Sequence, residues 1–286
     1  MSTSMTSKPR QRKRTRSFLF HATAIVVMAI FVIPLWWGVV ASLRQPGLPP
    51  PRTIEWLPRP AVWGNYARIF EMLPLARYTL NSLFVAAVAV PLTLVVASWA
   101  GFAMAQQRER TRKRLMIFSL VILLIPLTTL WLTRFILFKW LGLINTPFAL
   151  IVPALAGSSP LFVLLFYWTF RRIPKDLFES ARLDGAGALI VWRRIALPMA
   201  VPTTVAVGVL AFLFYWSDFI NPLMYLRSQE FYTLPVGLQQ LQQLDKTNWP
   251  LLMAGAVLMA GPAVVMFLFV QRYFLRDNRM IGSDGR

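Results

Sequence analysis

The chain has 286 residues, of which 57% are hydrophobic and only 14% are charged, and its mean hydropathy is +0.55. This composition excludes an ordinary soluble domain and indicates an integral membrane protein. The formal charge of +19 would suit nucleic-acid binding, but the basic residues lie at the ends of long uncharged stretches, as in membrane-protein loops. We therefore expect membrane lipid, and no nucleic acid, as a partner.

The chain contains no cysteine and a single histidine, His21. A thiolate site is therefore impossible, and one imidazole lacks the further ligands that a metal site requires. The sequence has no paired-carboxylate or nucleophile pattern and no G-x4-G-K-[ST] phosphate-binding loop. We expect no catalytic residues, no metal and no cofactor bound by this chain.

Six stretches approach or exceed the roughly 20 apolar residues that a transmembrane helix needs. The third stretch is the shortest, at 17 residues, and its outer end is the least sharply defined. The first has 27 residues, which is too long for an ordinary signal peptide, so we interpret it as an uncleaved anchor. We predict an all-α membrane protein with about six transmembrane helices. In chain order these are residues 17–43, 80–105, 115–131, 148–170, 199–220 and 251–270.

Alternate loops differ in their content of Lys and Arg. One set of segments carries 21 of the 30 basic residues and the opposite set carries nine, so both termini are predicted to be cytoplasmic in a bacterial inner membrane. The expected organisation is a basic N-terminal tail, an anchor, a Pro-rich external segment with a short helix over 63–75, a membrane core that includes the loop 171–198, and a C-terminal tail. The boundaries of these five parts are 1–16, 17–43, 44–79, 80–272 and 273–286.

Six prolines lie inside the predicted spans. Each removes a helical hydrogen bond, so we expect kinks at these positions. They are Pro34, Pro91, Pro126, Pro153, Pro160 and Pro262.

The loop 171–198 carries the most informative pattern. Pro174 is suited to the first turn of a helix and Gly185 to a left-handed stop, which predicts one short helix. A second is predicted over 188–195, before Pro198 turns the chain into the next span. Helices this short are marginal in water alone, so we expect them to dock onto a cytoplasmic partner. The apolar docking face expected on the first helix comprises Leu177, Phe178 and Ala181.

The spacing in this loop follows the EAA motif, E-A-A-x3-G-x9-I-x-L-P, with Ser180 in place of the second residue. On this motif, and on segments such as 141–146 and 233–238, the chain resembles inner-membrane permease subunits of ABC importers of the carbohydrate, maltose-type family. The resemblance extends from about Tyr78 to Phe274. The ATPase-coupling residues that it implies are Glu179, Ser180, Ala181, Asp184, Gly185, Ile195, Leu197 and Pro198.

The resemblance also implies partners. These are a homologous second permease subunit, two cytoplasmic ATPase subunits that hold ATP and Mg, and an extracytoplasmic solute-binding protein. Residues 276–286 depart from the Gly- and Lys-containing tail of the family, so no tail contact with the ATPase is carried over.

Alternative functions are an importer permease for a non-sugar solute such as a sugar- or glycerol-phosphate, and an ion-driven secondary transporter, which the absence of mid-span charges disfavours.

Asp218 is the only acidic residue within the six predicted spans, which makes it a candidate for contact with the substrate. Tyr215 and Asn221 lie nearby and suit a sugar, because aromatic rings stack on its C–H faces and amides bond its hydroxyl groups. Trp216 lies nearby too, although anchoring at the membrane interface is the plainer account of its ring. In a continuous helix Tyr215 and Asp218 share a side, so we expect that not all of these residues face the pathway.

Overall fold

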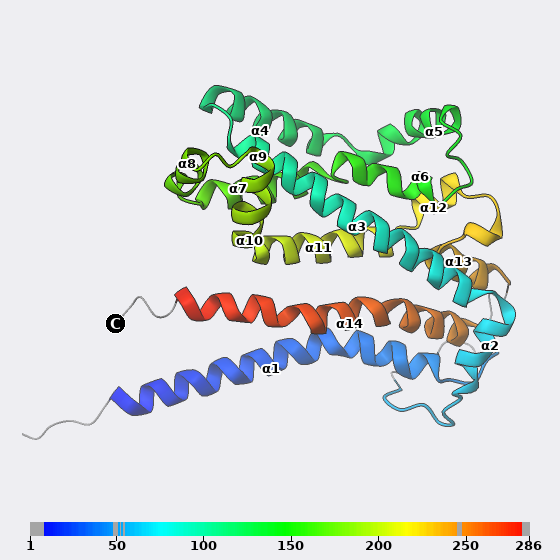
Figure 1. Ribbon diagram of the computed structural model, residues 1–286. Coiled ribbons are helices and arrows are strands. Elements are labelled where there is room, and N and C mark those ends of the chain that lie inside the picture. The colour runs from blue at the N-terminus through cyan, green and yellow to red at the C-terminus, as the bar shows by residue number, and fades with distance from the viewer. Residues whose placement is uncertain (1–8, 48–50, 52, 54, 245–247, 282–286) are drawn as a thin grey trace, which may run out of the picture. The chain divides into compact units, whose positions relative to one another are not determined.

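The computed structural model describes residues 9–47, 51, 53, 55–244 and 248–281, and every regular element within these ranges is helical (Figure 1). Four helical segments are each long and apolar enough to cross a membrane without a second helix. Two further candidates are pairs of helices, each bent by 85° at a short break. The predicted all-α membrane fold with about six spans is therefore confirmed. The first four segments are Leu19–Ser42, Leu75–Ala105, Phe148–Arg172 and Trp249–Gln271.

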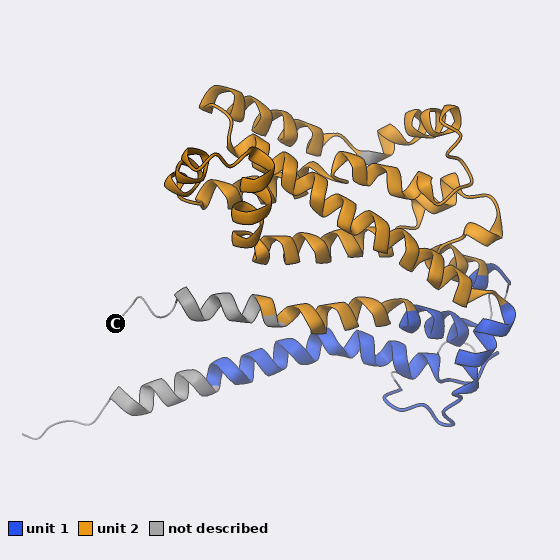
Figure 2. Ribbon diagram, in the orientation of Figure 1, with its two compact units in different colours: residues 1–72, 241–258 blue, residues 73–240, 259–286 orange. Residues whose placement is uncertain are grey.

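The chain divides into two compact units (Figure 2). The first comprises residues 1–72 and 241–258, and the second comprises residues 73–240 and 259–286. Helix α14 (Trp249–Ile281) contributes to both units. The terminal segments 1–8 and 282–286 of the predicted tails lie outside the described residues.

The first unit is built on helix α1 (Pro9–Ser42), which starts earlier than the predicted anchor and is not interrupted at Pro34. The predicted external helix forms as α2 (Gly64–Met72). Polar contacts join α2 to the C-terminal end of α1: the Asn65 amide donates to the carbonyl oxygens of Ser42 and Arg44, both at 2.7 Å. These bonds satisfy carbonyl groups at the end of α1, which lack partners within the helix.

Arg44, which follows α1, makes further contacts within the first unit. Its Nε lies 3.3 Å from the carboxylate of Glu55, and its guanidinium group lies over the Trp249 ring, 5.4 Å from the centroid. The Trp249 ring also stacks on Trp37, with the centroids 6.0 Å apart. The start of α14 is thus held against α1 within the first unit.

The second unit is built around helix α3 (Leu75–Ala105), which packs against α7 (Pro160–Arg172) and α11 (Val201–Trp216). Gly101 permits close approach of α3 and α7, because a Cβ atom there would lie 2.7 Å from the Cβ of Phe166. Small residues at helix contacts are typical of membrane bundles. A buried cluster that includes Phe102, Phe166 and Phe170 continues from this contact into the loop after α7.

Three successive spans of the second unit are interrupted. The third ends as α4 (Glu109–Leu124), because Pro126 holds Ile125 extended, and resumes as η1 (Leu127–Leu130) and α5 (Trp131–Trp140). The span predicted over 115–131 is therefore longer than expected at both ends, and it breaks at Pro126, where a kink was expected.

The fourth span comprises α6 (Phe148–Ile151), the 3₁₀ segment η2 (Val152–Ala156) and α7. Gly157 and Ser158 separate η2 from α7, with φ values of +73° and +60°. The fifth span ends as α11 at Trp216, earlier than the expected residue 220, and α12 (Ile220–Tyr225) follows. The segment that leads back to α14 contains η4 (Gln229–Phe231) and α13 (Leu234–Leu244).

The six prolines thus behave differently. Pro34, Pro91 and Pro262 lie inside uninterrupted helices, whereas the other three lie at or beside the interruptions of the third and fourth spans.

Candidate functional site

The first predicted loop helix forms as α8 (Lys175–Leu183), directly after Pro174. Gly185, at φ +77°, ends it: the Ala186 N–H donates to the carbonyl of Ala181 at 2.9 Å, and the Gly185 N–H to that of Arg182 at 3.0 Å. This pair of bonds is the Schellman arrangement, which requires a left-handed residue at the glycine position. The predicted stop at Gly185 is confirmed.

The second loop helix is longer than expected. It consists of α9 (Ala188–Val191), the π-helical segment η3 (Trp192–Ala196) and α10 (Leu197–Met199). The chain turns toward α11 at Ala200, after the expected turning point at Pro198, and the two helical parts meet at 85°. The Trp192 ring packs edge-on against Trp99 of α3, with the centroids 5.1 Å apart.

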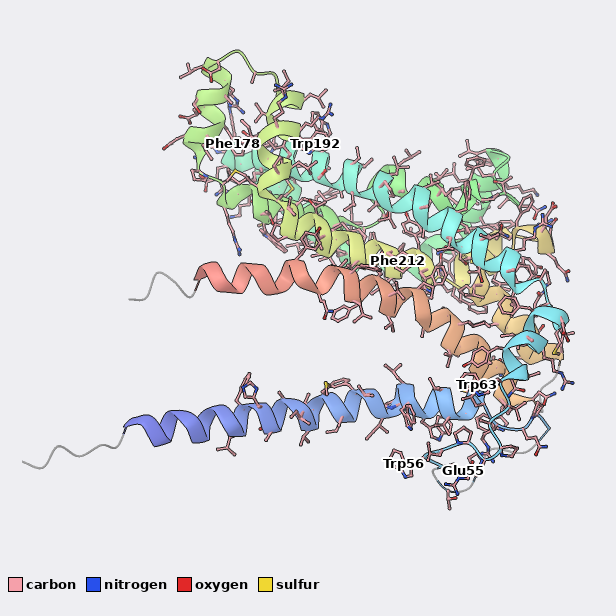
Figure 3. All side chains as sticks on the ribbon, turned by 60° about the horizontal axis from the view of Figure 1, so that its bottom comes forward. Glu55, Trp56, Trp63, Phe178, Trp192 and Phe212 are labelled. Carbon is pink, nitrogen blue, oxygen red and sulfur yellow. The ribbon has the colours of Figure 1, made fainter. Side chains whose placement is uncertain are left out.

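The apolar side of α8 packs inward, not outward. Phe178 is 5% exposed and Ala181 is 9% exposed, and both belong to the buried cluster that includes Trp192 (Figure 3). The Phe178 ring lies 6.0 Å from that of Phe102 on α3. The expectation that Leu177, Phe178 and Ala181 together meet a partner is wrong, because residues three apart share one helix face and this face meets α3 and α7.

The opposite surface of the loop is exposed and partly apolar. Leu183 is 89% exposed, and Leu177, Leu189 and Ile190 are also exposed. Leu183 lies three residues after Ser180 and so on the same face of the helix. Helical spacing could therefore have identified it as a docking residue, but it was not among those predicted. Among the predicted coupling residues, Glu179, Ser180, Asp184, Gly185 and Pro198 are exposed, Ile195 and Leu197 are half-buried, and Ala181 is buried.

A second feature lies where the three interrupted spans meet. A pocket of about 370 Å³ is lined from the breaks of the third, fourth and fifth spans. The Tyr215 hydroxyl lies 2.7 Å from Ser158 Oγ, which lies 2.5 Å from Thr93 Oγ1. Discontinuous membrane helices expose polar groups at depth, and transporters use such places to bind solutes.

All three predicted pathway residues, Tyr215, Asp218 and Asn221, line this pocket. Asn221 joins Tyr215 and Asp218 in this lining because α11 ends at Trp216 and the chain changes direction before α12. Trp216 itself does not line the pocket. Asp218 accepts hydrogen bonds from the Asn221 backbone N–H at 3.2 Å and from its side-chain amide at 2.9 Å. Its carboxylate therefore caps the first turn of α12.

Sequence reasoning did not identify Arg134 as a pathway residue. It lines the same pocket from α5 and interacts electrostatically with Asp218. Asn221 Oδ1 is buried and has no hydrogen-bond partner within the described residues, which leaves one acceptor available at the pocket. The pocket therefore offers a cation, an anion, a hydroxyl and an amide to a polar solute.

Comparison with known proteins identifies the fold and the family. Residues 94–279 match the family described as "Binding-protein-dependent transport system inner membrane component". The chain belongs to this family. It is therefore a multi-pass inner-membrane component of a binding-protein-dependent transport system, and the sequence-based assignment to importer permeases is confirmed.

Relatives of this permease include the arabinooligosaccharides transport system permease protein AraQ of Halalkalibacterium halodurans, 36% identical over 72% of this chain and 73% of that protein. The sulfoquinovosyl glycerol transport system permease protein SmoH of Agrobacterium fabrum is 30% identical over 87% of both chains. A solved bacterial ABC transporter involved in alginate import has the same fold, with a TM-score of 0.69 at 20% identity, covering 96% of the permease and 100% of that chain.

Proposed function

We propose that this permease forms half of the translocation pathway for a carbohydrate in an ATP-driven importer, and that the loop 171–198 couples it to cytoplasmic ATPase subunits. The observation that carries the proposal is the two-sided packing of α8. One side is buried against the protein's own spans, and the other exposes Leu183 and the polar residues of the EAA motif. A partner that docks on the exposed side can displace such a helix, and the buried side then transmits the displacement to the membrane spans.

Aromatic contacts provide the mechanical route. Phe178 of α8 meets Phe102 at the end of α3, and Phe102 meets Phe170 at the end of α7, with ring centroids 6.0 and 5.9 Å apart. A displacement of α8 therefore displaces two spans, because closely packed interiors transmit strain. ATP and Mg are bound by the partner ATPases, whose closure would rock the spans between inward- and outward-open states.

The proposed assembly contains a homologous second permease, two ATPases and an extracytoplasmic solute-binding protein. The orientation, with both termini in the cytoplasm, rests on the distribution of Lys and Arg. Carbohydrate as the substrate class is supported by the pocket's polar groups and by relatives named for arabinooligosaccharide, galactooligosaccharide and maltodextrin transport. Tyr215, Asp218 and Asn221 are the proposed contacts of the sugar hydroxyl groups.

The coupling role is tested with Gly185→Trp and a matched control, Gly142→Trp. Both glycines have positive φ, +77° and +66°, and in neither case would an added Cβ meet another atom within 4 Å. The backbone penalty of about 1–2 kcal/mol is therefore the same, and only the location differs. Gly142 lies in the short turn after α5, away from the loop.

We expect Gly185→Trp to lower ATPase stimulation by the loaded binding protein about tenfold or more, within the usual range of coupling energies. The Gly142→Trp complex should keep its stimulation, and both proteins should reach the membrane in equal amounts. Equal stimulation of the two complexes would refute the docking role of the loop.

The alternative substrate, a sugar- or glycerol-phosphate, is favoured by the cationic Arg134 in the pocket and opposed by the carboxylate of Asp218 beside it. Competition assays on reconstituted transport decide between them. Inhibition of uptake by neutral oligosaccharides, retained in Arg134→Gln, supports carbohydrate, whereas inhibition by phosphate esters alone supports the alternative.

A further inference from the structure

A second pocket, of about 190 Å³, lies beside α8, where α3 and α7 end and α4 begins. Its volume admits several water molecules. Four elements, α3 with its following turn, α4, α7 and α8, each contribute polar or charged side chains. These are Gln106, Gln107, Arg112, Arg171, Lys175, Glu179 and Arg182.

The charges in this pocket are unbalanced. Four cations face one carboxylate, so the lining has a formal surplus of three positive charges. Two ion pairs occur in the described part of the chain, Arg44–Glu55 and Arg77–Glu230, and neither involves this pocket. Arg182 donates to the neutral amide oxygen of Gln106 at 2.8 Å, which satisfies a donor but neutralises no charge.

The pocket also lies at a defined depth. Arg171 belongs to the last turn of α7, and Arg112 lies three residues before Leu115, where the apolar run of α4 begins. Basic residues that flank apolar spans in this way lie at the level of lipid headgroups. Guanidinium groups bind phosphate oxygens through paired N–H donors. Two or more arginines around one cavity therefore favour a phosphate group over a neutral polar ligand.

We propose that this pocket binds a phosphate group, carried either by the headgroup of an anionic lipid or by a small soluble compound. This goes beyond the proposed function, and only the choice of the cytoplasmic leaflet rests on it. A bound phosphate group would bridge Lys175 and Arg182 of α8 to Arg171 of α7 and Arg112 of α4. It would thereby brace the loop helix against the spans.

The test uses the full-length permease, alone and in its transport complex, with equal amounts of phosphatidylglycerol and phosphatidylcholine. Native mass spectrometry counts the lipids retained. We expect preferential retention of phosphatidylglycerol, weakened about fivefold by Arg171→Gln, which corresponds to about 1 kcal/mol for one basic residue at an anionic surface. Arg172→Gln is the matched control. Arg172 is the next residue along the chain, and its side chain is exposed but does not line the pocket.

Arg171→Lys separates a binding defect from a folding defect, since it restores the charge and should restore most of the retention. In a second arm, inorganic phosphate and glycerol 3-phosphate are added to the protein in neutral detergent. A rise in melting temperature for the wild type but not for Arg171→Gln assigns the site to a soluble compound, and selective lipid retention assigns it to a headgroup. Equal retention by Arg171→Gln and Arg172→Gln, with no thermal shift of the wild type, would overturn the proposal.

Discussion

Substitution of Gly101 by alanine probes the contact between α3 and α7. The new Cβ would lie 2.7 Å from Phe166 Cβ, 2.8 Å from the Val163 carbonyl oxygen and 2.9 Å from the Tyr167 nitrogen. Ordinary contacts of this kind begin at 3.4 Å, and two of these three atoms belong to the backbone, so the helices must separate by several tenths of an ångström. Overpacking of this kind costs about 1–3 kcal/mol.

Gly208→Ala is the matched control. Its Cβ would meet Leu94 Cδ1 at 3.7 Å, which is ordinary contact, and Gly208 also lies within a membrane helix of the second unit. Both substitutions gain the same roughly 0.5–1 kcal/mol from helix propensity, so this term cancels in the comparison. We expect Gly101→Ala to be less stable than Gly208→Ala by about 1–3 kcal/mol in SDS-induced unfolding of the purified protein.

If the two variants unfold at the same SDS concentration, the approach of α3 and α7 at Gly101 is looser than described. The mechanical route from α8 through Phe102 and Phe170 would then lose its support, because it depends on tight packing of the same two helices.

The remaining predictions concern the loop 171–198 and the turn at Asn145. Phe178→Ala should loosen α8, because about 3–5 kcal/mol of core packing is lost, and hydrogen exchange in the loop should rise, whereas Leu177→Ala should leave it unchanged. Equal exchange in both variants would contradict the inward packing. Asn145 has φ +62°, and its Oδ1 accepts from the N–H groups of Arg227 and Ser228 at 2.9 and 2.8 Å. Asn145→Ala should destabilise the protein by about 1–3 kcal/mol and Asn145→Gly by less, and the reverse order in thermal unfolding would refute this account.

Much of the architecture was predictable because membrane insertion imposes local rules. Each span must satisfy its own backbone within about 20 apolar residues, so the six stretches were visible in the chain without knowledge of their neighbours. Gly185 could likewise be identified as a helix stop, since the left-handed conformation depends on that residue alone. The spacing from Glu179 to Pro198 identified the family that residues 94–279 match.

Other features depended on contacts between distant segments. Whether a proline kinks a span or ends it is decided by what replaces the lost hydrogen bond, so Pro91 lies inside a helix while Pro126 separates two. Helical spacing placed Phe178 and Ala181 on one face, but only the presence of Phe102 and Phe170 determined that this face is buried.

The sequence by itself determined the membrane class, the number of apolar stretches, the stop at Gly185 and the motif that marks the family, because each depends on local composition or spacing. The tertiary structure decided that Tyr215, Asp218 and Asn221 share one pocket with Arg134, and that four cations gather beside α8. Both groupings bring together residues from three or four separate elements. Such proximity arises from the packing of helices against one another, which no local pattern encodes.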